Sequence, residues 1–574
     1  MMHSDKYIQA LVESQSFFEI HRENVLGVEM DVFKNRPRSL VDFIELSASH
    51  GEKPYLIYQD KVISFTQHLT LVKKAAHILQ SQHNVKPGDR VAIYAANCPE
   101  WIIFFWATVS IGAIACGLNG WWKGSEAIKA IDAADPNVIV SDQKRFDRIA
   151  DQVKHPTLIF EDLDLTSYEQ ELKSFVRIDE DECACLLYTS GTTGTPKGVM
   201  TSHRSMIANS TLQMLQGAAV SQHSSSYGID WSKNTPTSLL TSPLFHVSGL
   251  SAGAVTSLFA GSTTLVYDGR FLAERVIELI QKFSVTSWGG AVPTALKRLL
   301  DEAEAKSLQL ESVLVIGGGG APMPPELIER TKGVFPNSEY SFGYGYGLTE
   351  SGAITIINWG ETLKEEPSSP GQSMPSIKIE LRDEEGKKVT ADSVEGEIYV
   401  QSPSVMLGYY NNPEASAAAL TSDRWLRTGD WGHKRGSLYF ISSRRTDLIL
   451  RGAENVYPQE IELILDSHKD VEESAVIGIP HDDLGQEVMA IVSTKNSQLS
   501  DSELSVWVGK DLADFKVPSK WKIIDTPLPR NASGKLMKHV LIDTSKNTMV
   551  EEDDEFLVLR SMYMNESHLH PLLQ

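Results

Sequence analysis

Residues 189–198 read Thr-Ser-Gly-Thr-Thr-Gly-Thr-Pro-Lys-Gly and concentrate hydroxyls, glycines and one lysine in a short segment. Glycines let backbone N–H groups turn toward a ligand, hydroxyls add hydrogen-bond donors, and Lys197 adds a full positive charge. Together these groups could hold a polyphosphate. The segment is not a Walker loop, because Gly198 follows Lys197 where that motif has Ser or Thr. An ordinary surface loop rich in Ser, Thr and Gly is the competing interpretation.

Four other short segments carry groups suited to binding or catalysis. They lie far apart in the sequence, as expected of a site built from loop ends. Residues 317–320 are four consecutive glycines, which would let a ligand approach the backbone closely. Residues 345–350 offer an aromatic ring, a hydroxyl and a carboxylate, and residues 428–430 offer a carboxylate suited to ribose hydroxyls. Residues 529–535 end in a lysine on a predicted turn.

A rival chemistry is indicated by residues 249–253, which fit the Gly-x-Ser-x-Gly pattern of a hydrolase nucleophile elbow. Such an elbow needs a strand before it and a helix after it. A serine hydrolase therefore stays a distant alternative, although it leaves the other motifs unexplained. Labelling of Ser251 by an active-site serine probe would distinguish the two hypotheses.

The elements that must position these segments follow an alternating pattern of apolar runs and helical stretches. The runs that predict strands are residues 90–95, 138–141, 183–188, 262–267 and 312–316. This alternation predicts an α/β fold with layered, largely parallel sheets. From about residue 377 the pattern changes to short strands around turns, which we expect to form a small barrel-like β part.

A domain boundary is predicted at the polar residues 443–447, which follow an apolar strand. We expect a large N-terminal domain over residues 1–442 and a smaller, mobile α+β domain over residues 443–545. Residues 546–574 are expected to form an acidic, solvated tail.

Composition limits the classes of partner and compartment. The chain has 574 residues, 41% of them apolar, and a net charge of −22, which argues against nucleic acid or an anionic membrane surface as a partner. Residues 101–122 are uncharged but interrupted by glycines, so we expect a buried helix followed by a buried strand, with no transmembrane segment. Four cysteines without metal-ligand or disulfide spacing, together with the lack of a signal sequence, predict a cytoplasmic location.

Taken together, the motifs resemble those of the adenylate-forming superfamily, which contains acyl-CoA synthetases, luciferases and peptide-synthetase adenylation domains. The resemblance extends from about residue 40 to 545, and its most specific parts are residues 189–198 and 345–350. It implies an AMP-binding adenylation domain followed by the family's C-terminal domain. It also implies an acid–thiol ligase that uses ATP, Mg²⁺ and coenzyme A: a carboxylate attacks the α-phosphorus of ATP, and coenzyme A then displaces AMP from the acyl-adenylate.

The resemblance also implies roles for single residues. Tyr346 would stack on adenine, Thr349 would touch the α-phosphate, and Glu350 would bind Mg²⁺. The other residues that it assigns to the nucleotide are Thr189, Ser190, Gly191, Thr192, Thr193, Gly194, Lys197, Gly319, Gly320, Ala321, Gly347, Asp430 and Arg444. Lys535 would bridge the substrate carboxylate and the phosphate oxygens, and His246 would stand between the acyl pocket and the pantetheine channel.

Gly452, Phe515 and Lys516 resemble the family's contacts with coenzyme A. Two departures lie at the hinge and near it, where Thr446 and Ala453 replace more usual residues. Small residues at 288–291 and 317–320 imply room for a medium-to-long-chain or bulky acid, which would fit fatty-acid metabolism. An acyl-AMP ligase that loads a carrier protein stays an alternative.

Overall fold

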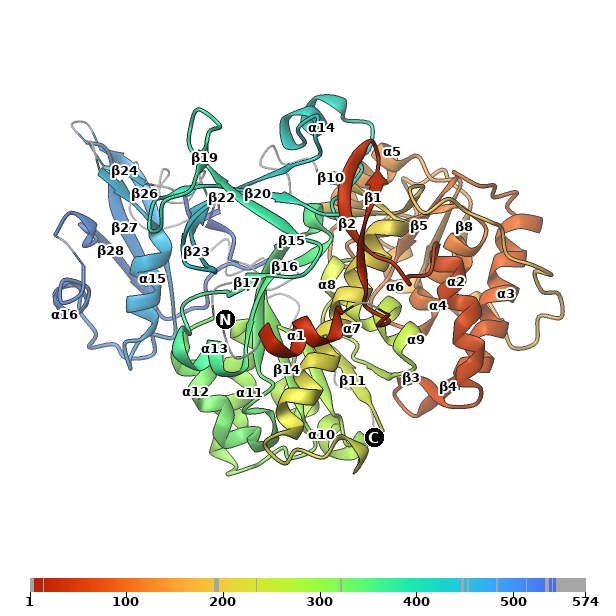
Figure 1. Ribbon diagram of the computed structural model, residues 1–574, viewed down its shortest axis with the longest axis horizontal. Coiled ribbons are helices and arrows are strands. Elements are labelled where there is room, and N and C mark those ends of the chain that lie inside the picture. The colour runs from red at the N-terminus through yellow and green to blue at the C-terminus, as the bar shows by residue number, and fades with distance from the viewer. Residues whose placement is uncertain are drawn as a thin grey trace. The chain divides into compact units, whose positions relative to one another are not determined.

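The computed structural model describes residues 5–13, 15–189, 196–233, 235–320, 323–444, 447, 449–451, 454–481, 484–512, 514–531, 536–538 and 540–542. The chain divides into two compact units, Met1–Ile441 and Ser442–Gln574, and each is described by itself. Figure 1 labels their helices and strands.

The first unit contains a seven-stranded sheet. In spatial order its strands are β21 (Gly408–Tyr409), β10 (Lys197–Ser202), β9 (Cys183–Thr189), β6 (Ile114–Leu118), β5 (Arg90–Tyr94), β7 (Val138–Ser141) and β8 (Thr157–Ile159). The strands from β9 to β8 pair in parallel, whereas β10 runs antiparallel to β9 and to β21. The helices that accompany them are α3 (Phe65–Ser81), α4 (Pro99–Ser110), α5 (Gly124–Ala134) and α6 (Gln143–Phe146).

Helix α4 is apolar on every side, and all its residues except Glu100 are buried. Pro99 at its first turn has no N–H to leave unpaired, which suits a helix start. The chain then enters strand β6, so the prediction of a buried helix followed by a buried strand is confirmed. None of the helices in the described part of the chain has the length and hydropathy that a bilayer crossing requires.

The second sheet of this unit has nine strands. In spatial order they are β17 (Gln372–Ser373), β16 (Ala353–Trp359), β15 (Gly343–Leu348), β14 (Val315–Gly319), β13 (Ser287–Ala291), β11 (Thr237–Leu240), β12 (Thr263–Val266), β3 (Pro54–Tyr58) and β4 (Lys61–Ser64). The strand predicted at residues 312–316 begins only at Val315, because the residues before it form a turn.

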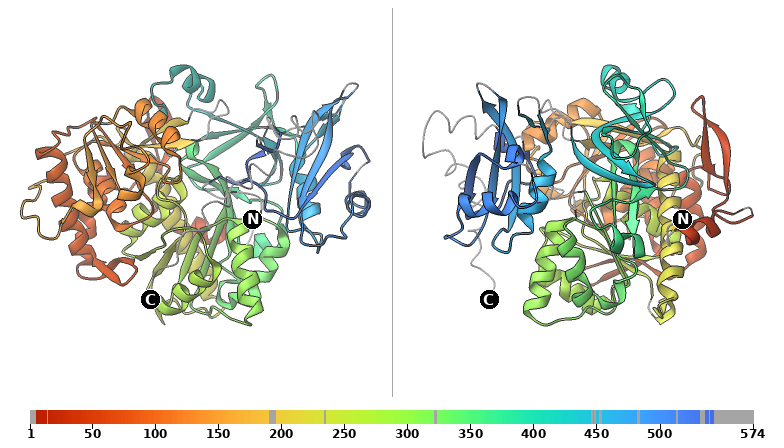
Figure 2. Two further views of the ribbon diagram at one scale, coloured as in Figure 1. Left: turned by 180° about the vertical axis from the view of Figure 1, so that it is seen from behind. Right: turned by 60° about the vertical axis from the view of Figure 1, so that its left-hand side comes forward.

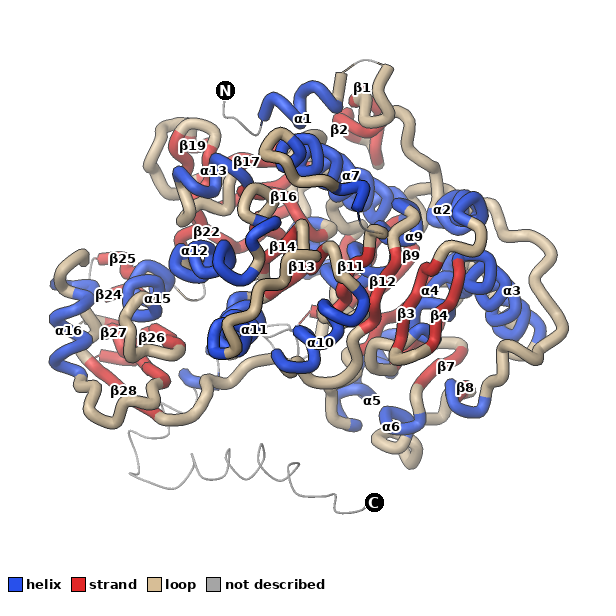
Figure 3. The backbone as a smooth tube through the Cα atoms, turned by 90° about the horizontal axis from the view of Figure 1, so that it is seen from below, coloured by secondary structure: helices blue, strands red, loops and turns tan. Residues whose placement is uncertain are grey.

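Helices cover both faces of this sheet. One face packs against α10 (Ala273–Phe283), α11 (Pro293–Ala305) and α12 (Pro325–Val334) in one hydrophobic core, and α7 (His203–Ser225) belongs to another. Figure 3 shows α10 to α12 along one side and α7 along the other, and Figure 2 shows α11 and α12 in green. The remaining helices are short: α1 (Asp5–Leu11), α2 (Leu40–Leu46), α8 (Val247–Gly249), α9 (Ser257–Ala260), α13 (Gly360–Glu365) and α14 (Pro413–Ala419).

A third, five-stranded sheet corrects one expectation. Its order is β19 (Lys388–Val389), β18 (Lys378–Arg382), β20 (Gly396–Gln401), β22 (Leu426–Arg435) and β23 (Leu438–Arg444). The predicted barrel-like β part is wrong, because in the described residues β19 and β23 are opposite edges of an open sheet. The α/β class itself, with a larger N-terminal and a smaller C-terminal unit, is confirmed.

A buried ionic cluster ties the N-terminal hairpin, β1 (Ile20–Val25) and β2 (Val28–Phe33), to the rest of the first unit. Arg36 Nη2 lies 2.7 Å from Glu23 Oε1 and 2.8 Å from Glu180 Oε1. Arg204, at the start of α7, approaches the same two carboxylates at 3.0 Å and 2.8 Å. Their hydrogen bonds outweigh burial and lower the pKa of Glu23 to about 2.

The second unit is α+β. Its sheet has the order β25 (Glu454–Val456), β24 (Ile449–Arg451), β27 (Gly485–Ser493) and β26 (Glu473–His481), with β28 (Lys520–Ile524) parallel to β27. Its α-helices include α15 (Pro458–Asp466) and α16 (Asp501–Val508). Apolar side chains from this sheet form two hydrophobic clusters.

Candidate active site

The segment predicted to hold a polyphosphate joins β9 to β10. These strands pair antiparallel with Lys197 directly opposite Thr189. Strand β9 is buried from Ala184 to Tyr188, so the start of the segment is fixed in the core. Ser190, Gly191, Thr192, Thr193 and Gly194 lie outside the described residues. The register therefore brings the two ends of the predicted phosphate loop side by side.

Glu350 contacts hydroxyl groups next to the two ends of this loop. Its Oε1 accepts a hydrogen bond from the Tyr409 hydroxyl at 3.0 Å and from Thr189 Oγ1 at 3.4 Å. Lys197 Nζ lies 5.2 Å from the centre of the Tyr409 ring. A half-buried carboxylate beside two hydroxyls could hold a divalent cation, and the ammonium group over the Tyr409 ring could bind phosphate oxygens. The residues present thus fit the magnesium and polyphosphate chemistry expected from the sequence.

Tyr409 is a member of this cluster that the sequence motifs did not reveal. It comes from β21, whose two residues pair with β10, and the Met406 N–H donates to the Glu350 carbonyl at 2.9 Å. Both contacts depend on pairing between distant segments. A tyrosine in a strand of two residues gives no local sign of such a position.

Tyr346 and Asp430, both predicted to bind adenosine, are in direct contact. The Tyr346 hydroxyl donates to Asp430 Oδ2 at 2.6 Å. Asp430 is only 5% exposed, and its backbone N–H donates to Thr428 Oγ1 at 3.1 Å. The Thr428 hydroxyl in turn donates to the Ile398 carbonyl on β20 at 2.8 Å. The Thr-Gly-Asp motif therefore lies within strand β22, where the threonine side chain holds the backbone of Asp430.

The glycines near Tyr346 serve the sheet itself. A Cβ atom on Gly347 would lie 1.6 Å from the Ala353 carbonyl oxygen, at the irregularity between β15 and β16. Gly319 faces Gly345 across β14 and β15, and its Cβ would lie 3.2 Å from the Gly345 oxygen. Gly320 has φ +81°, a conformation that favours glycine. Ala321 lies outside the described residues, and Thr349 directly follows β15.

Two other glycines border open space. Among the described residues, a Cβ on Gly289 would meet no atom within 4 Å, and one on Gly317 would meet only Gly289 Cα at 3.6 Å and Gly290 N at 3.9 Å. Trp288 is fully buried, and its indole N–H donates to Thr241 Oγ1 at 2.9 Å. Neighbouring strands β13 and β14 thus present a surface without side chains.

His246 and Ser251 lie in one helical stretch. His246 is half-buried before α8, with its ring centre 5.0 Å from that of Phe245. Ser251 lies inside the π-helix Leu250–Thr256, is 2% exposed, and its hydroxyl oxygen accepts from Gln213 Nε2 at 2.9 Å. A nucleophile elbow needs an exposed serine on a strand-to-helix turn. The serine-hydrolase alternative is therefore wrong.

In the second unit, Phe515 and Lys516 lie in the 3₁₀ helix Asp514–Lys516. Lys516 Nζ pairs with Glu460 Oε1 at 2.8 Å, and Phe515 packs against a hydrophobic core. Arg444 ends strand β23. Four residues of the predicted hinge and substrate contacts lie outside the described part of the chain: Thr446, Gly452, Ala453 and Lys535.

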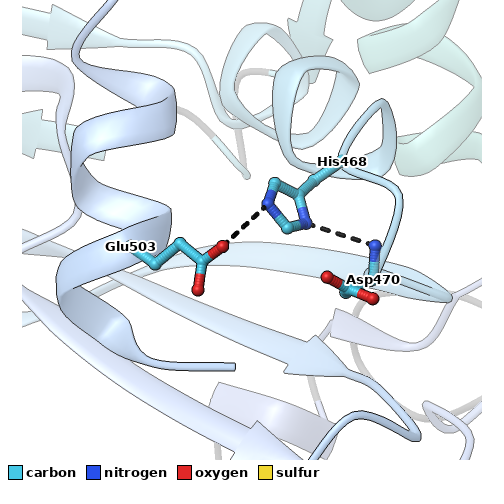
Figure 4. Close-up of side chains that lie close together, drawn as sticks. All are labelled: His468, Asp470 and Glu503. Carbon is cyan, nitrogen blue, oxygen red and sulfur yellow. Dashed lines mark hydrogen bonds and ion pairs between the residues drawn. The ribbon is translucent and has the colours of Figure 1, made fainter. Parts of the chain in front are cut away.

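A cluster of possible metal ligands in this unit is explained by hydrogen bonding. Potential ligand atoms of His468, Asp470 and Glu503 lie within 4.8 Å of one another (Figure 4). His468 Nδ1 accepts the Asp470 N–H at 3.2 Å, which leaves the ring proton on Nε2, facing Glu503 Oε1 at 3.7 Å. A metal ion would need the lone pair of Nε2. This geometry favours a hydrogen-bonded cluster.

Comparison with known proteins agrees with this arrangement. Residues 44–410 match the AMP-binding enzyme family, and residues 460–535 match the AMP-binding enzyme C-terminal domain. The long-chain-fatty-acid–CoA ligase of Bacillus subtilis (strain 168) is 29% identical over 87% of this chain and 92% of its own length. The 2-succinylbenzoate–CoA ligase of the same strain is 32% identical over 87% and 96%.

Solved structures give the same result. The o-succinylbenzoate CoA synthetase of Bacillus subtilis with its acyl-adenylate intermediate has a TM-score of 0.74, at 29% identity over 87% of this chain and 97% of its own. The same enzyme with ATP and a magnesium ion has a TM-score of 0.73, at 29% identity over 87% and 98%. The chain therefore belongs to the AMP-binding enzyme family and is an acid–thiol ligase that forms an acyl-adenylate and then an acyl-CoA thioester.

Proposed function

We propose that this ligase activates a medium-to-long-chain or bulky carboxylic acid and transfers it to coenzyme A. The observation that carries the proposal is the convergence of Glu350, Thr189, Lys197 and Tyr409 at the ends of the predicted phosphate loop. Adenylation brings a carboxylate toward a polyanion, so catalysis rests mainly on charge neutralisation and alignment.

In the first half-reaction, Thr189 and Lys197 bind the terminal phosphates through a hydroxyl and an ammonium group. Glu350 supplies a carboxylate oxygen to Mg²⁺, which when bound neutralises phosphate charge. Tyr346 and Asp430 bind the adenosine, and their mutual hydrogen bond of 2.6 Å supports a shared position for them. Lys535 orients the attacking carboxylate against the α-phosphate.

The second half-reaction uses groups of the second unit. Gly452 and the Phe515–Lys516 pair contact coenzyme A, and Lys516 exchanges its ion pair with Glu460 for a phosphate of this substrate. Lys516 Nζ lies 2.8 Å from Glu460 Oε1 with side chains 23% and 29% exposed, and a phosphate would offer its ammonium group an alternative anionic partner.

The side-chain-free surface at Gly289 and Gly317 supports a large acyl group, because none of the described side chains lies where a Cβ on either glycine would project. The named relatives include one ligase for a long-chain fatty acid and one for 2-succinylbenzoate, so both long and bulky acids occur among their substrates. A role in fatty-acid metabolism is part of this proposal. We also place the enzyme in the cytoplasm, since its cysteines Cys116 and Cys185 are buried free thiols, as suits a reducing compartment.

The test is carboxylate-dependent ATP–pyrophosphate exchange over acids of increasing length and bulk, repeated as AMP release with and without coenzyme A. We expect exchange with long or bulky acids and AMP release that depends on coenzyme A. Acid-dependent exchange together with AMP release that coenzyme A does not increase would favour a carrier-protein acceptor. A preference for acetate-sized acids would contradict the proposed substrate class.

A further inference from the structure

The turn that carries Glu350 is held from outside through its backbone carbonyls. The Met406 N–H donates to the Glu350 carbonyl at 2.9 Å, and Ser404 Oγ donates to the Ser351 carbonyl at 2.8 Å. The next residue, Gly352, has φ +81°, and a Cβ there would collide with the Ser404 carbonyl oxygen. The neighbouring loop therefore fixes the backbone from which the Glu350 carboxylate projects.

The carbonyl of Gly352 starts a chain of hydrogen bonds that runs along helix α7. It accepts from Asn209 Nδ2, and Asn209 Oδ1 accepts from Gln213 Nε2 at 3.1 Å. These two amides are four residues apart and so share one face of α7, which lies against the π-helix that contains Ser251. Gln213 Nε2 also donates to Ser251 Oγ at 2.9 Å. Asn209 and Ser251 are each 2% exposed, so water has little access to these bonds.

The order of donors and acceptors gives this chain one direction. A carbonyl oxygen only accepts, so Asn209 must turn its amide nitrogen toward Gly352 and its amide oxygen toward Gln213. Gln213 must then present its own nitrogen, whose two hydrogens serve Asn209 and Ser251. Each amide is thereby oriented by its neighbours. If Ser251 lost its hydroxyl, Gln213 would keep only one of the two bonds that orient it.

The far end of the chain lies in the helical stretch that begins at His246. The Leu250 N–H donates to the His246 carbonyl at 2.9 Å, and the π-helix follows. The Tyr55 hydroxyl supports this helix by donating to the Ala254 carbonyl at 2.8 Å. π-Helices are rare and occur often at functional sites. The hydrogen bonds of Asn209 therefore reach from the Glu350 turn to an irregular helix beside His246.

We propose that Asn209 and Gln213 are positioning residues that link the turn at Glu350 to the helical stretch at His246. The link rests on the proposed function, in which Glu350 binds Mg²⁺ and His246 borders the acid. The two amides act through the turn and the stretch rather than on a substrate. Because they fix both, a change at Ser251 should alter metal-dependent binding of ATP. All of these residues belong to the first unit.

The test measures ATP affinity by calorimetry with and without Mg²⁺, in the absence of any acid. Gln213→Met keeps the length of the side chain but removes both N–H groups. We expect ATP binding to weaken about tenfold with Mg²⁺ and not without it, since Asn209 loses the buried partner that orients it. Ser251→Ala should weaken it about threefold, because Gln213 keeps its bond to Asn209. Gln216→Met, at a half-buried glutamine of the same helix, is the matched control and should change neither value.

A double variant shows whether the effect passes along the chain. If Ser251 acts through Gln213, adding Ser251→Ala to Gln213→Met should cause no further loss of affinity. A full additional loss, no loss in one of the single variants, or an equal loss with and without Mg²⁺ would overturn the proposal. So would an unchanged affinity with fewer binding sites per protein molecule, which indicates partial unfolding.

Glu350→Gln tests the function on which the link depends. It should remove most of the effect of Mg²⁺ on ATP affinity. If ATP binding in this variant stayed as dependent on Mg²⁺ as in the unmodified enzyme, the role proposed for Glu350 would fail, whatever the two amides do. The two failures are therefore distinguishable.

Discussion

The nucleotide groups of the first unit and the lysine segment of the second, residues 529–535, are held by different forces. In the first unit, strand register places Lys197 opposite Thr189. Around Tyr346, backbone segments approach so closely that only glycine fits. In the second unit, carboxylates hold the two flanks of the lysine segment through Arg530 and Lys538. A substitution that disturbs backbone pairing between strands displaces the whole strand, whereas a substitution in an ion pair can lower its interaction energy without moving the backbone. The strand-paired groups of the first unit should therefore be held rigidly, whereas the described flanks of the lysine segment should be adjustable.

The largest loss of activity should come from Gly347→Ala, which tests whether the backbone fixes the binding groups of the first unit. The added Cβ would lie 1.6 Å from the Ala353 oxygen, so β15 and β16 must separate next to Tyr346, at the irregularity in their pairing. We expect adenylation to fall about 1,000-fold or more, with a lower melting temperature of the first unit. Gly333→Ala, in helix α12, is the control and should preserve activity, because its Cβ would meet no described atom within 4 Å beyond its own helix. Normal activity in Gly347→Ala would contradict a backbone-fixed site.

A smaller loss is expected from Tyr409→Phe, which removes the hydroxyl that donates to Glu350. A hydrogen bond to a charged group contributes about 1.5–3 kcal/mol, so ATP affinity measured in the presence of Mg²⁺ should fall about 10- to 150-fold. The neighbouring Tyr410→Phe serves as the matched control. An unchanged ATP affinity would remove Tyr409 from the site, and an equal loss in both variants would indicate a general packing effect.

The smallest expected effect is the pH dependence of folding stability. One buried carboxyl group in each unit should change this stability with opposite sign. Hydrogen bonds to Arg36 and Arg204 lower the pKa of Glu23 to about 2, so its stabilising contribution is present above pH 4.5 and is lost as the pH falls toward 2. Burial, the largest cause, raises the pKa of Asp466 to about 7. Its folded form keeps a proton that the unfolded chain has lost, so the second unit loses stability as the pH rises from about 4 through 7.

Hydrogen exchange resolved by unit would measure this difference. Glu23→Gln should reduce the loss of stability at acid pH in the first unit and leave that of the second unit unchanged. Asp466→Asn, which keeps an acceptor for the Ser474 hydroxyl, should stabilise the second unit at pH 8 and not at pH 4. The same pH response in both units would refute the contrast.

The sequence sufficed for parts of the molecule whose signals are local. The motif around Lys197 and the apolar run of β9 predicted a buried strand that leads into a phosphate-binding segment, because burial and residue type are encoded within a few positions. Tyr409 could not be found this way, because β21 has only two residues and its position is set by its pairing with β10, which is distant in the sequence. The barrel-like part was wrong for a related reason: closure of a sheet depends on hydrogen bonds between its edges, which no single segment encodes.

The separation of Thr189 and Glu350, 161 positions apart in the chain, has a consequence for biosynthesis. A ribosome must release almost the whole first unit before these side chains can meet, and closing so long a loop is slow. A nascent chain that ends before β21 has no Tyr409 and no complete set of partners for ATP. Nucleotide therefore cannot guide early folding of this enzyme. It can stabilise only molecules that have already finished folding.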